Sequence, residues 1–402
     1  MDALLARRAI ESLRKGIPPD GCVRTFTVGR RSEVGQLAAT LSRGGPAALL
    51  LKADYGSGKT HLLRFLREMA LEEGYAVSYI ALDSKSSVRF NRMDQIFGAV
   101  IRNICMPVTG EAGPGALFGA VLDAPPLARP DGALKRLPEA LFGLKSPALF
   151  LGLLAWIAGT RGPLEQRHMP GEVEAWLCEP WNYYTRRRWL QKRLDAAVRA
   201  CFGLGLDGYC ATFNLREHGC HRAWEALADL DLLARSAGSR GLVLLVDEFE
   251  DVIYNLKGGG RFRHGPNAGR VDYQFDAFCN LFRLFAGDFP GLSFYAVTPG
   301  FVNKCTELLK IKGYGDFDYS RFEVLPTFEM SALDEAQLRE LAWRITQAHG
   351  LAYEWEPTRV LDIYRLYDIV RSAASVQVPD RARQTIRRVV GALDELQQNS
   401  DV

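Results

Sequence analysis

Short, predominantly apolar runs recur along the chain, separated by longer stretches in which apolar residues return at helical spacing. Runs of this kind are typical of strands that are buried on both faces of a parallel sheet. Strands that alternate with helices favour an α/β fold in which helices cover both faces of that sheet. The strands are expected at residues 47–51, 76–82, 241–246 and 292–297.

Three other parts of the chain carry helical patterns without a convincing strand. Residues 2–15 are amphipathic and end at glycine and proline. A proline- and glycine-rich stretch followed by helical patterns predicts a mostly helical insertion, and the region from residue 331 onward predicts a helical C-terminal lid. The expected division is residues 1–104 for the N-terminal helix and the first part of the core, 105–225 for the insertion, 226–330 for the second part of the core and 331–402 for the lid.

The composition is that of a globular protein. Of the 402 residues, 48% are hydrophobic and 24% are charged, and the net charge is +3. A net charge this small does not indicate a nucleic-acid partner by itself, so only local basic clusters could do so. The longest apolar run, residues 147–159, is too short to cross a bilayer and predicts a buried helix, so no membrane contact is expected.

The eight cysteines are scattered, without a C-x-x-C pair. Because no signal-peptide pattern opens the sequence either, we expect reduced thiols and a cytoplasmic location. A zinc site at Cys210, His218, Cys220 and His221 is an alternative that we disfavour, since the adjacent Cys220 and His221 would point in different directions on a regular element.

The strand expected at residues 47–51 leads into a glycine-rich turn and then a helix. This turn fits the P-loop pattern G-x-x-x-x-G-K-S/T, except that Ala53 replaces the first glycine. Its glycines let the backbone N–H groups face a phosphate chain, and the helix N-terminus adds a positive dipole end. Lys59 is expected to reach the β- and γ-phosphates of ATP, and the Thr60 hydroxyl to ligate Mg²⁺. The predicted phosphate-binding residues are Gly56, Ser57, Gly58, Lys59, Thr60 and His61.

A second candidate for chemistry is the Asp247-Glu248 pair, which follows the apolar run 241–246. Carboxylates at the end of a central parallel strand emerge at the sheet edge where ligands bind. We expect Asp247 to hold Mg²⁺ and Glu248 to polarise the attacking water. The alternative is a polar start to a loop.

Three further residues are candidates for sensing the γ-phosphate. Thr298 follows the run 292–297, at the position where P-loop ATPases with an extra strand between the P-loop strand and the Asp-Glu strand carry a polar sensor. Arg383, in the basic start of the last helix, is expected to reach the phosphate from the lid, unless it lies on a solvated face. Arg321 is a candidate arginine finger directed towards a neighbouring subunit.

Two basic stretches are candidates for contact with DNA. Residues 181–193 mix basic and aromatic side chains, which can neutralise phosphates and stack on bases. The alternative is a helix whose aromatic residues pack inward while its arginines remain solvated. A second basic segment, at residues 257–264, is glycine-rich and either contacts a polyanion or is disordered. The basic candidates are Arg186, Arg187, Arg188, Lys192 and Arg193 in the first stretch, and Arg261 and Arg263 in the second.

These pieces together resemble the ATP-binding proteins of bacteriophage-exclusion (BREX) systems, a branch of AAA+ ATPases near the Orc/Cdc6 group. The stretches that carry the resemblance are ARRAIESLRKGIPPDGCVRTF, LKADYGSGKTHLLRF, SAGSRGLVLLVDEFEDV with LSFYAVTPGF, and RARQTIRRVV. AAA+ proteins also carry a G-R-x-x-E stretch where the chain wraps the adenine, which makes Gly29 and Arg30 candidate nucleotide-binding residues. The implied fold is an AAA+ P-loop NTPase core with a helical insertion and a helical lid.

The resemblance implies an ATP-binding and ATP-hydrolysing component of anti-phage defence that works with a helicase or DNA-modification partner. It makes Lys59 and Thr60 the Walker A pair, Asp247 and Glu248 the Walker B pair, and Thr298 the sensor. Arg383 would be the lid arginine, although Ala382 precedes it where a proline is expected. A homo-oligomer is compatible with the sequence. The alternatives are an ATP-gated adaptor that recruits defence proteins without touching DNA, and the less favoured small-molecule kinase.

Overall fold

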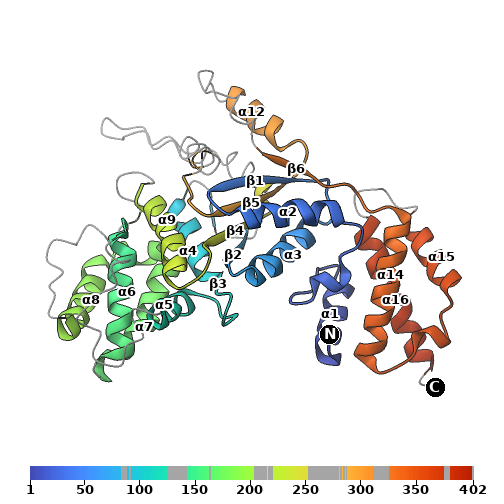
Figure 1. Cartoon of the computed structure of the whole chain (residues 1–402), viewed down its shortest axis with the longest axis horizontal. Helices are drawn as coiled ribbons and strands as arrows, with labels where there is room; N and C mark the ends of the chain where they lie inside the picture. Colours follow the sequence, from blue (N-terminus) through green and yellow to red (C-terminus); the bar gives the residue numbers. More distant parts are fainter. Residues whose placement is uncertain are drawn as a thin grey trace.

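The computed structural model shows a central sheet with one group of helices on each side (Figure 1). It describes residues 1–82, 88–89, 92–124, 143–162, 164–202, 215, 221–251, 280, 283, 286, 288–311, 326–374 and 381–400. The candidate residues Arg261, Arg263 and Arg321, and three of the four in the disfavoured zinc site, lie outside them.

The sheet has six strands in the order β3-β2-β4-β5-β1-β6. All neighbouring strands are parallel except β3, which runs antiparallel to β2. The predicted α/β fold is therefore confirmed, and the strand that ends before Thr298 does lie between the P-loop strand and the Asp-Glu strand. The strands are β1 (Ala47–Lys52), β2 (Ala76–Ala81), β3 (Ile104–Cys105), β4 (Leu242–Asp247), β5 (Leu292–Val297) and β6 (Thr327–Glu329).

Alternate residues of each central strand face two different hydrophobic clusters, because side chains of a strand point to opposite faces in turn. In β4, Leu242, Leu244 and Val246 join one cluster. Val243 and Leu245 join the other. The first face is covered by α4 (Met93–Arg102) and α9 (His221–Ser236), and the second by α2 (Arg31–Arg43) and α3 (Lys59–Glu72).

The insertion extends the first of these clusters away from the sheet (Figure 1). The predicted helix at residues 147–159 is buried, as expected. The expectation of helices without strands is corrected at the start of the insertion, where Cys105 pairs with β2 as part of β3. In the described part of the chain no helix is both long and apolar enough to cross a membrane. The helices of the insertion are α5 (Pro114–Asp123), α6 (Pro147–Arg161), α7 (Met169–Cys178) and α8 (Arg187–Phe202), with short 3-10 turns at Leu164–Gln166 and Pro180–Tyr183.

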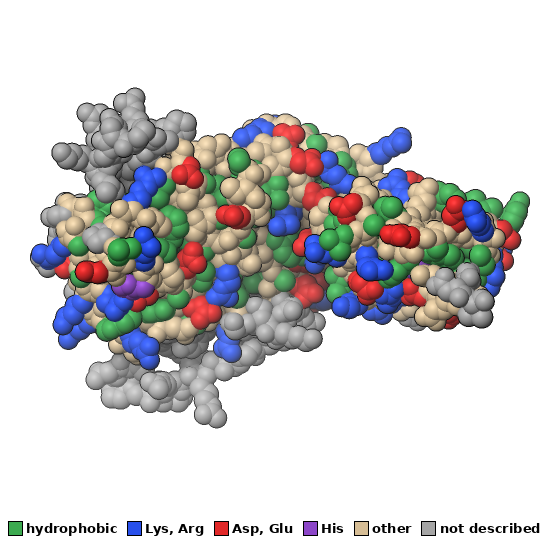
Figure 2. Space-filling model, turned by 90° about the horizontal axis from the view of Figure 1, so that it is seen from below, with side chains coloured by type: hydrophobic (Ala, Val, Ile, Leu, Met, Phe, Trp, Pro, Cys, Tyr) green, Lys and Arg blue, Asp and Glu red, His purple; other side chains and the backbone are tan. Residues whose placement is uncertain are grey.

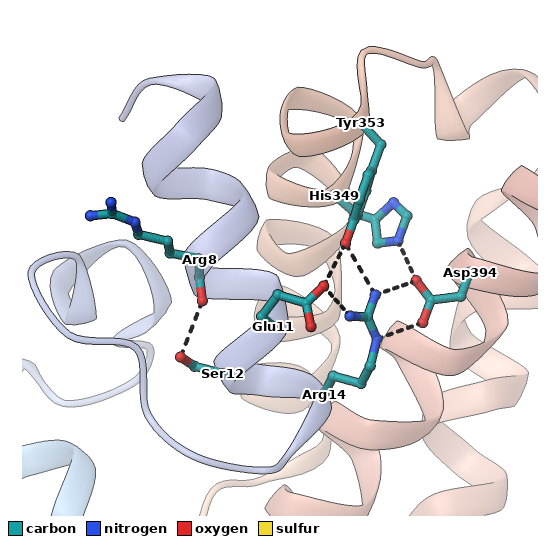
Figure 3. Close-up of polar contacts among 7 residues, drawn as sticks. All are labelled: Arg8, Glu11, Ser12, Arg14, His349, Tyr353 and Asp394. Atoms are coloured by element: carbon teal, nitrogen blue, oxygen red, sulfur yellow. Dashed lines mark hydrogen bonds and ion pairs between the residues drawn. The ribbon is translucent and has the colours of Figure 1, made fainter.

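The C-terminal helices form a third hydrophobic cluster, which also contains the N-terminal helix α1 (Ala3–Arg14). Asp334 and Gln337 form a capping box at the start of α14 (Glu335–Tyr353). Polar contacts reinforce the attachment of α1: Arg14 donates to both oxygens of Asp394, at 2.9 and 2.8 Å (Figure 3). The C-terminal helices are α14 (Glu335–Tyr353), α15 (Ile363–Ala374) and α16 (Arg381–Ser400), preceded along the chain by α12 (Phe301–Ile311); the 3-10 turns are η1 (Val23–Phe26), η7 (Phe249–Asp251) and η8 (Pro357–Arg359).

Candidate functional site

The glycine-rich turn joins β1 to α3 as the sequence predicts. Gly56 and Gly58 have φ angles of 77° and 99°, a region that residues with a Cβ rarely occupy. Ser57 Oγ donates to the Asp54 carbonyl at 2.5 Å and holds the turn closed. Ala53, which replaces the usual glycine, is only 3% exposed and belongs to a core cluster. Its methyl group is therefore packed in the core.

Lys59 is folded back onto its own loop. Its Nζ donates to the carbonyls of Ala53 at 2.9 Å and Asp54 at 3.3 Å. Glu250 Oε1 lies 3.9 Å from the same nitrogen. The ammonium is thus kept at the loop by carbonyl and carboxylate oxygens, and phosphate oxygens would be stronger partners for it.

Asp247 ends β4 on the same edge of the sheet and is only 4% exposed. Both carboxylate oxygens accept hydrogen bonds: Oδ1 from the Glu248 N–H at 2.9 Å, and Oδ2 from the Tyr79 hydroxyl at 2.6 Å. Burial, and secondarily the charge of Asp247, raise the pKa of Tyr79 well above its usual value. Glu248 has a φ of 52°, which is strained for a residue with a side chain. The backbone at the end of β4 is therefore held in an uncommon turn.

Arg30, in the predicted G-R-x-x-E stretch, contacts the P-loop. It is only 7% exposed, pairs with Glu33 at 3.0 Å, and donates to the Ser57 carbonyl at 3.0 Å. It also donates to the Ser331 carbonyl at 2.6 Å, just before the lid. The motif's arginine and glutamate are thus paired with each other, and Arg30 connects the P-loop to the start of the C-terminal region. Gly29, with a φ of 64°, makes the turn that precedes it.

His61 lies on the first turn of α3 and its Nε2 is 2.9 Å from Thr27 Oγ1. Burial, together with the nearby charges of Arg30 and Arg64, lowers the pKa of His61 to about 4. The imidazole is therefore neutral near pH 7 and serves to fasten α3 to the segment after η1.

The lid reaches the P-loop through Arg383 on α16. Its guanidinium carbon lies 5.6 Å from the centroid of the Tyr55 ring, within range of a cation–π contact. Tyr55 is in the P-loop and is 61% exposed. Arg383 and the glycine-rich turn are consequently close together in this structure.

These groups surround one cavity of about 530 Å³. This volume lies in the range of small-molecule sites. Apolar side chains from the N-terminal segment and from the C-terminal region, among them Leu13, Ile17, Leu341 and Ile386, also line it. The polar or loop-forming residues of the lining include Arg30, Gly56, Ser57, Gly58, Lys59, Thr60, His61, Tyr79, Asp247, Glu248, Glu250 and Arg383.

Thr298 follows β5 at the predicted edge of the sheet and is half-buried, but it is not part of the cavity lining. Its carbonyl accepts the Phe301 N–H at 3.0 Å at the start of α12. Its role as a sensor stays a prediction. The same holds for the arginine finger at Arg321, which lies outside the described residues.

The basic candidates on the insertion are only partly available for DNA. Arg193 forms an ion pair with Glu172 at 2.6 Å and lies 5.2 Å from the Trp189 ring centroid. Arg186, Arg188 and Lys192 are exposed, whereas the side chain of Arg187 is outside the described set. Lys and Arg side chains are interspersed with Asp and Glu over the face drawn in Figure 2.

Three residues that line the cavity were not predicted from the sequence: Tyr55, Tyr79 and Glu250. Tyr55 lies within the P-loop, and Glu250 lies two residues after Glu248. Their closeness in sequence to these motifs could have indicated that they belong to the site. Tyr79 is found only from the strand register, in which Ala81 is paired with Asp247. Nothing local in residues 76–82 shows which strand will be the neighbour.

A family model described as BREX system ATP-binding protein BrxC/D matches residues 3–124. No curated protein and no solved structure gives a significant match to the chain. The proximity to the Orc/Cdc6 branch therefore stays a prediction. The resemblance to the BREX system ATP-binding proteins is confirmed through residues 3–124, the part of the chain that carries the P-loop.

Proposed function

We propose that the chain binds ATP with Mg²⁺ in the cavity between the P-loop and the lid and hydrolyses the terminal phosphate slowly. The observation that supports this most directly is the convergence of Lys59, Asp247, Glu248 and Arg383 on one cavity of about 530 Å³. Cations at the loop and the lid suit a triphosphate, while the two carboxylates suit a metal ion and a water.

The residues present fit the metal ion. Thr60 and Asp247 offer a hydroxyl and a carboxylate to the same cavity, and Mg²⁺ prefers such oxygen ligands. When bound, the ion would neutralise charge on the phosphates. The chain's own contribution is to hold the phosphates against the N–H groups of the loop. Lys59 would then exchange its carbonyl partners for phosphate oxygens. Glu248 would orient and polarise the attacking water, while Lys59 would offset the negative charge that develops as the γ-phosphoryl group passes to water and ADP leaves.

We expect slow turnover by the isolated chain, because the two proposed catalytic arginines would act on the sites of different subunits. Arg383 is close to the P-loop in this structure, whereas the proposed arginine finger, Arg321, would act on the site of a neighbouring subunit. We propose that a homo-oligomer, DNA, or a helicase or DNA-modification partner completes the site and receives the change in shape between nucleotide states.

The nucleotide proposal is tested by titrating a fluorescent ATP analogue against Lys59→Ala and Glu248→Gln. Lys59→Ala should weaken binding by at least about tenfold, because a charged hydrogen-bond donor is lost. Glu248→Gln should bind normally but release phosphate roughly a hundredfold more slowly. Lys52→Ala is the matched control, since Lys52 pairs with Glu329 at 3.2 Å outside the cavity lining. Unchanged affinity and hydrolysis in Lys59→Ala would refute the proposal.

A second candidate is the ATP-gated adaptor that recruits defence proteins without binding DNA. The pairing of Arg193 with Glu172 and Trp189 favours it, because those contacts occupy part of the basic cluster. Binding to single- and double-stranded DNA should be measured across a salt series, with and without ATP, for the wild type and the Arg186→Ala/Arg188→Ala variant. Affinity that depends on ATP, on salt and on these arginines would exclude the adaptor.

A further inference from the structure

We propose that Tyr79 is a positioning residue for the metal ion, fixing the carboxylate of Asp247 before the ion arrives. This inference rests on the proposed function, because it concerns how the same cavity takes Mg²⁺ with a nucleotide. Tyr79 lies outside the P-loop and the Asp247-Glu248 pair in sequence. It belongs to β2, the strand next to β4.

The geometry of the contact is that of a strong hydrogen bond. The Tyr79 hydroxyl donates to Asp247 Oδ2 at 2.6 Å, within the range typical of an O–H group bound to an ionised carboxylate. The second oxygen accepts the Glu248 N–H at 2.9 Å. Two donors, one on each oxygen, fix the plane of the carboxylate, while each oxygen keeps a further lone pair for a metal-bound water.

The position of Tyr79 distinguishes it from a tyrosine that merely fills the core. Tyr79 lines the cavity, and it is half-buried in the strand. Tyr75, just before the same strand, is fully packed and donates to the Leu41 carbonyl at 2.8 Å, an ordinary structural bond. Of these two tyrosines, Tyr79 is the one whose hydroxyl is directed at a group that would serve the ligand.

The wall around Tyr79 also connects the metal side of the cavity to the N-terminal segment. Arg64, on α3, lines the same cavity and donates to the Pro18 carbonyl at 2.5 Å. Tyr79, Arg64 and Pro18 therefore line one cavity, which extends from Asp247 to the N-terminal segment.

The test compares nucleotide affinity with and without metal. The dissociation constant of a fluorescent ADP is measured in Mg²⁺ and in EDTA, and the ratio of the two is the metal enhancement. Tyr79→Phe should leave the affinity in EDTA within about twofold of wild type and reduce the metal enhancement by about tenfold, the lower end of the effect of losing a group that orients a metal ligand. Tyr75→Phe, the matched control, should lower thermal stability without changing the ratio.

A double-mutant cycle shows whether Tyr79 acts through Asp247. In an Asp247→Ala background, adding Tyr79→Phe should change the metal enhancement by less than about twofold. An unchanged or larger enhancement in Tyr79→Phe, or an equal loss of affinity in Mg²⁺ and in EDTA, would overturn the inference. A wild type that binds ADP without any metal enhancement would also overturn it, whereas a wild type that binds no nucleotide would refute the proposed function itself.

Discussion

At the scale of single residues, the site depends on glycines whose conformation a side chain would disturb. Gly29 is the clearest case outside the P-loop: its φ is 64°, and a Cβ added there would overlap the side-chain amide of Gln337. That amide oxygen accepts the Asp334 N–H at 2.9 Å in the capping box of α14. The turn before Arg30 and the start of α14 are therefore packed against each other at a point where a side chain on residue 29 would displace that of Gln337.

We predict that Gly29→Ala lowers the free energy of unfolding by about 1–3 kcal/mol. The alanine would be held in the left-handed region of φ, and its Cβ would displace the Gln337 side chain from the capping box of α14. The measurement is thermal and chemical denaturation. Gly35→Ala is the matched control, because a Cβ at Gly35, in the middle of α2, would meet no atom within 4 Å. It should stabilise the protein by roughly 0.5–1 kcal/mol, the difference in helix propensity. Equal effects of the two changes would contradict the packing of Gly29 against the lid.

At the scale of elements, a polar network joins α1, α14 and α16 (Figure 3). Arg14 and His349 both contact Asp394, and Tyr353 contacts both Arg14 and Glu11. His349 Nδ1 accepts the Trp355 indole N–H at 2.9 Å, and its Nε2 lies 3.0 Å from Asp394 Oδ1. Both ring nitrogens are satisfied only when the imidazole is neutral with its proton on Nε2.

This network predicts a loss of stability on mild acidification. Burial lowers the pKa of His349, against the opposing effect of Asp394, and burial lowers that of His61 to about 4. A depressed pKa means that the unfolded chain binds more protons, so the contribution is complete above about pH 6.5 and declines as the pH falls below it. The slope is at most about 1.4 kcal/mol per pH unit for each proton taken up.

Melting temperatures between pH 8 and pH 4.5 measure this dependence. His349→Gln, which keeps a donor and an acceptor but cannot be protonated, should flatten the curve between pH 6.5 and pH 5. His168→Gln, a change at an exposed histidine outside this network, provides the control. A steeper curve in His349→Gln would contradict the neutral imidazole. Asp394 belongs to a lower window: burial raises its pKa, but hydrogen bonds from Arg14 and His349 outweigh this, so its contribution is lost only as the pH falls below about 4.

The elements that the sequence predicts well are those with a local pattern. β4 and β5 are buried along their whole length, and a continuous apolar run reports this directly. β6 alternates exposed and buried over three residues, and β3 has two residues, so both depend on a neighbouring strand for their existence. Similarly, the P-loop and Asp247-Glu248 are readable as motifs. The contacts of Arg30 with the Ser57 and Ser331 carbonyls join distant segments, which no local pattern encodes.

At the scale of the whole molecule, the cavity is lined by residues of the N-terminal segment, the core and the C-terminal helices together. A ligand that contacts all three is expected to stabilise the native arrangement, by about 2.7 kcal/mol at a hundred times its dissociation constant. Because α1 shares its hydrophobic cluster with the C-terminal helices, these parts would respond to the nucleotide as one body.

The residue that would transmit this response is Arg383, which contacts Tyr55 of the P-loop from the lid. We predict that Arg383→Ala weakens ATP about tenfold but ADP less than twofold, because the guanidinium would exchange the ring for the terminal phosphate only when that phosphate is present. Arg388→Ala controls for charge on the same helix, since Arg388 donates to Ser372 Oγ at 3.3 Å and is absent from the lining of the cavity. Calorimetric titration with each nucleotide provides the comparison. Equal losses for ATP and ADP would place Arg383 at a part of the nucleotide common to both, and closure of the lid would then not distinguish the state before hydrolysis from the state after it.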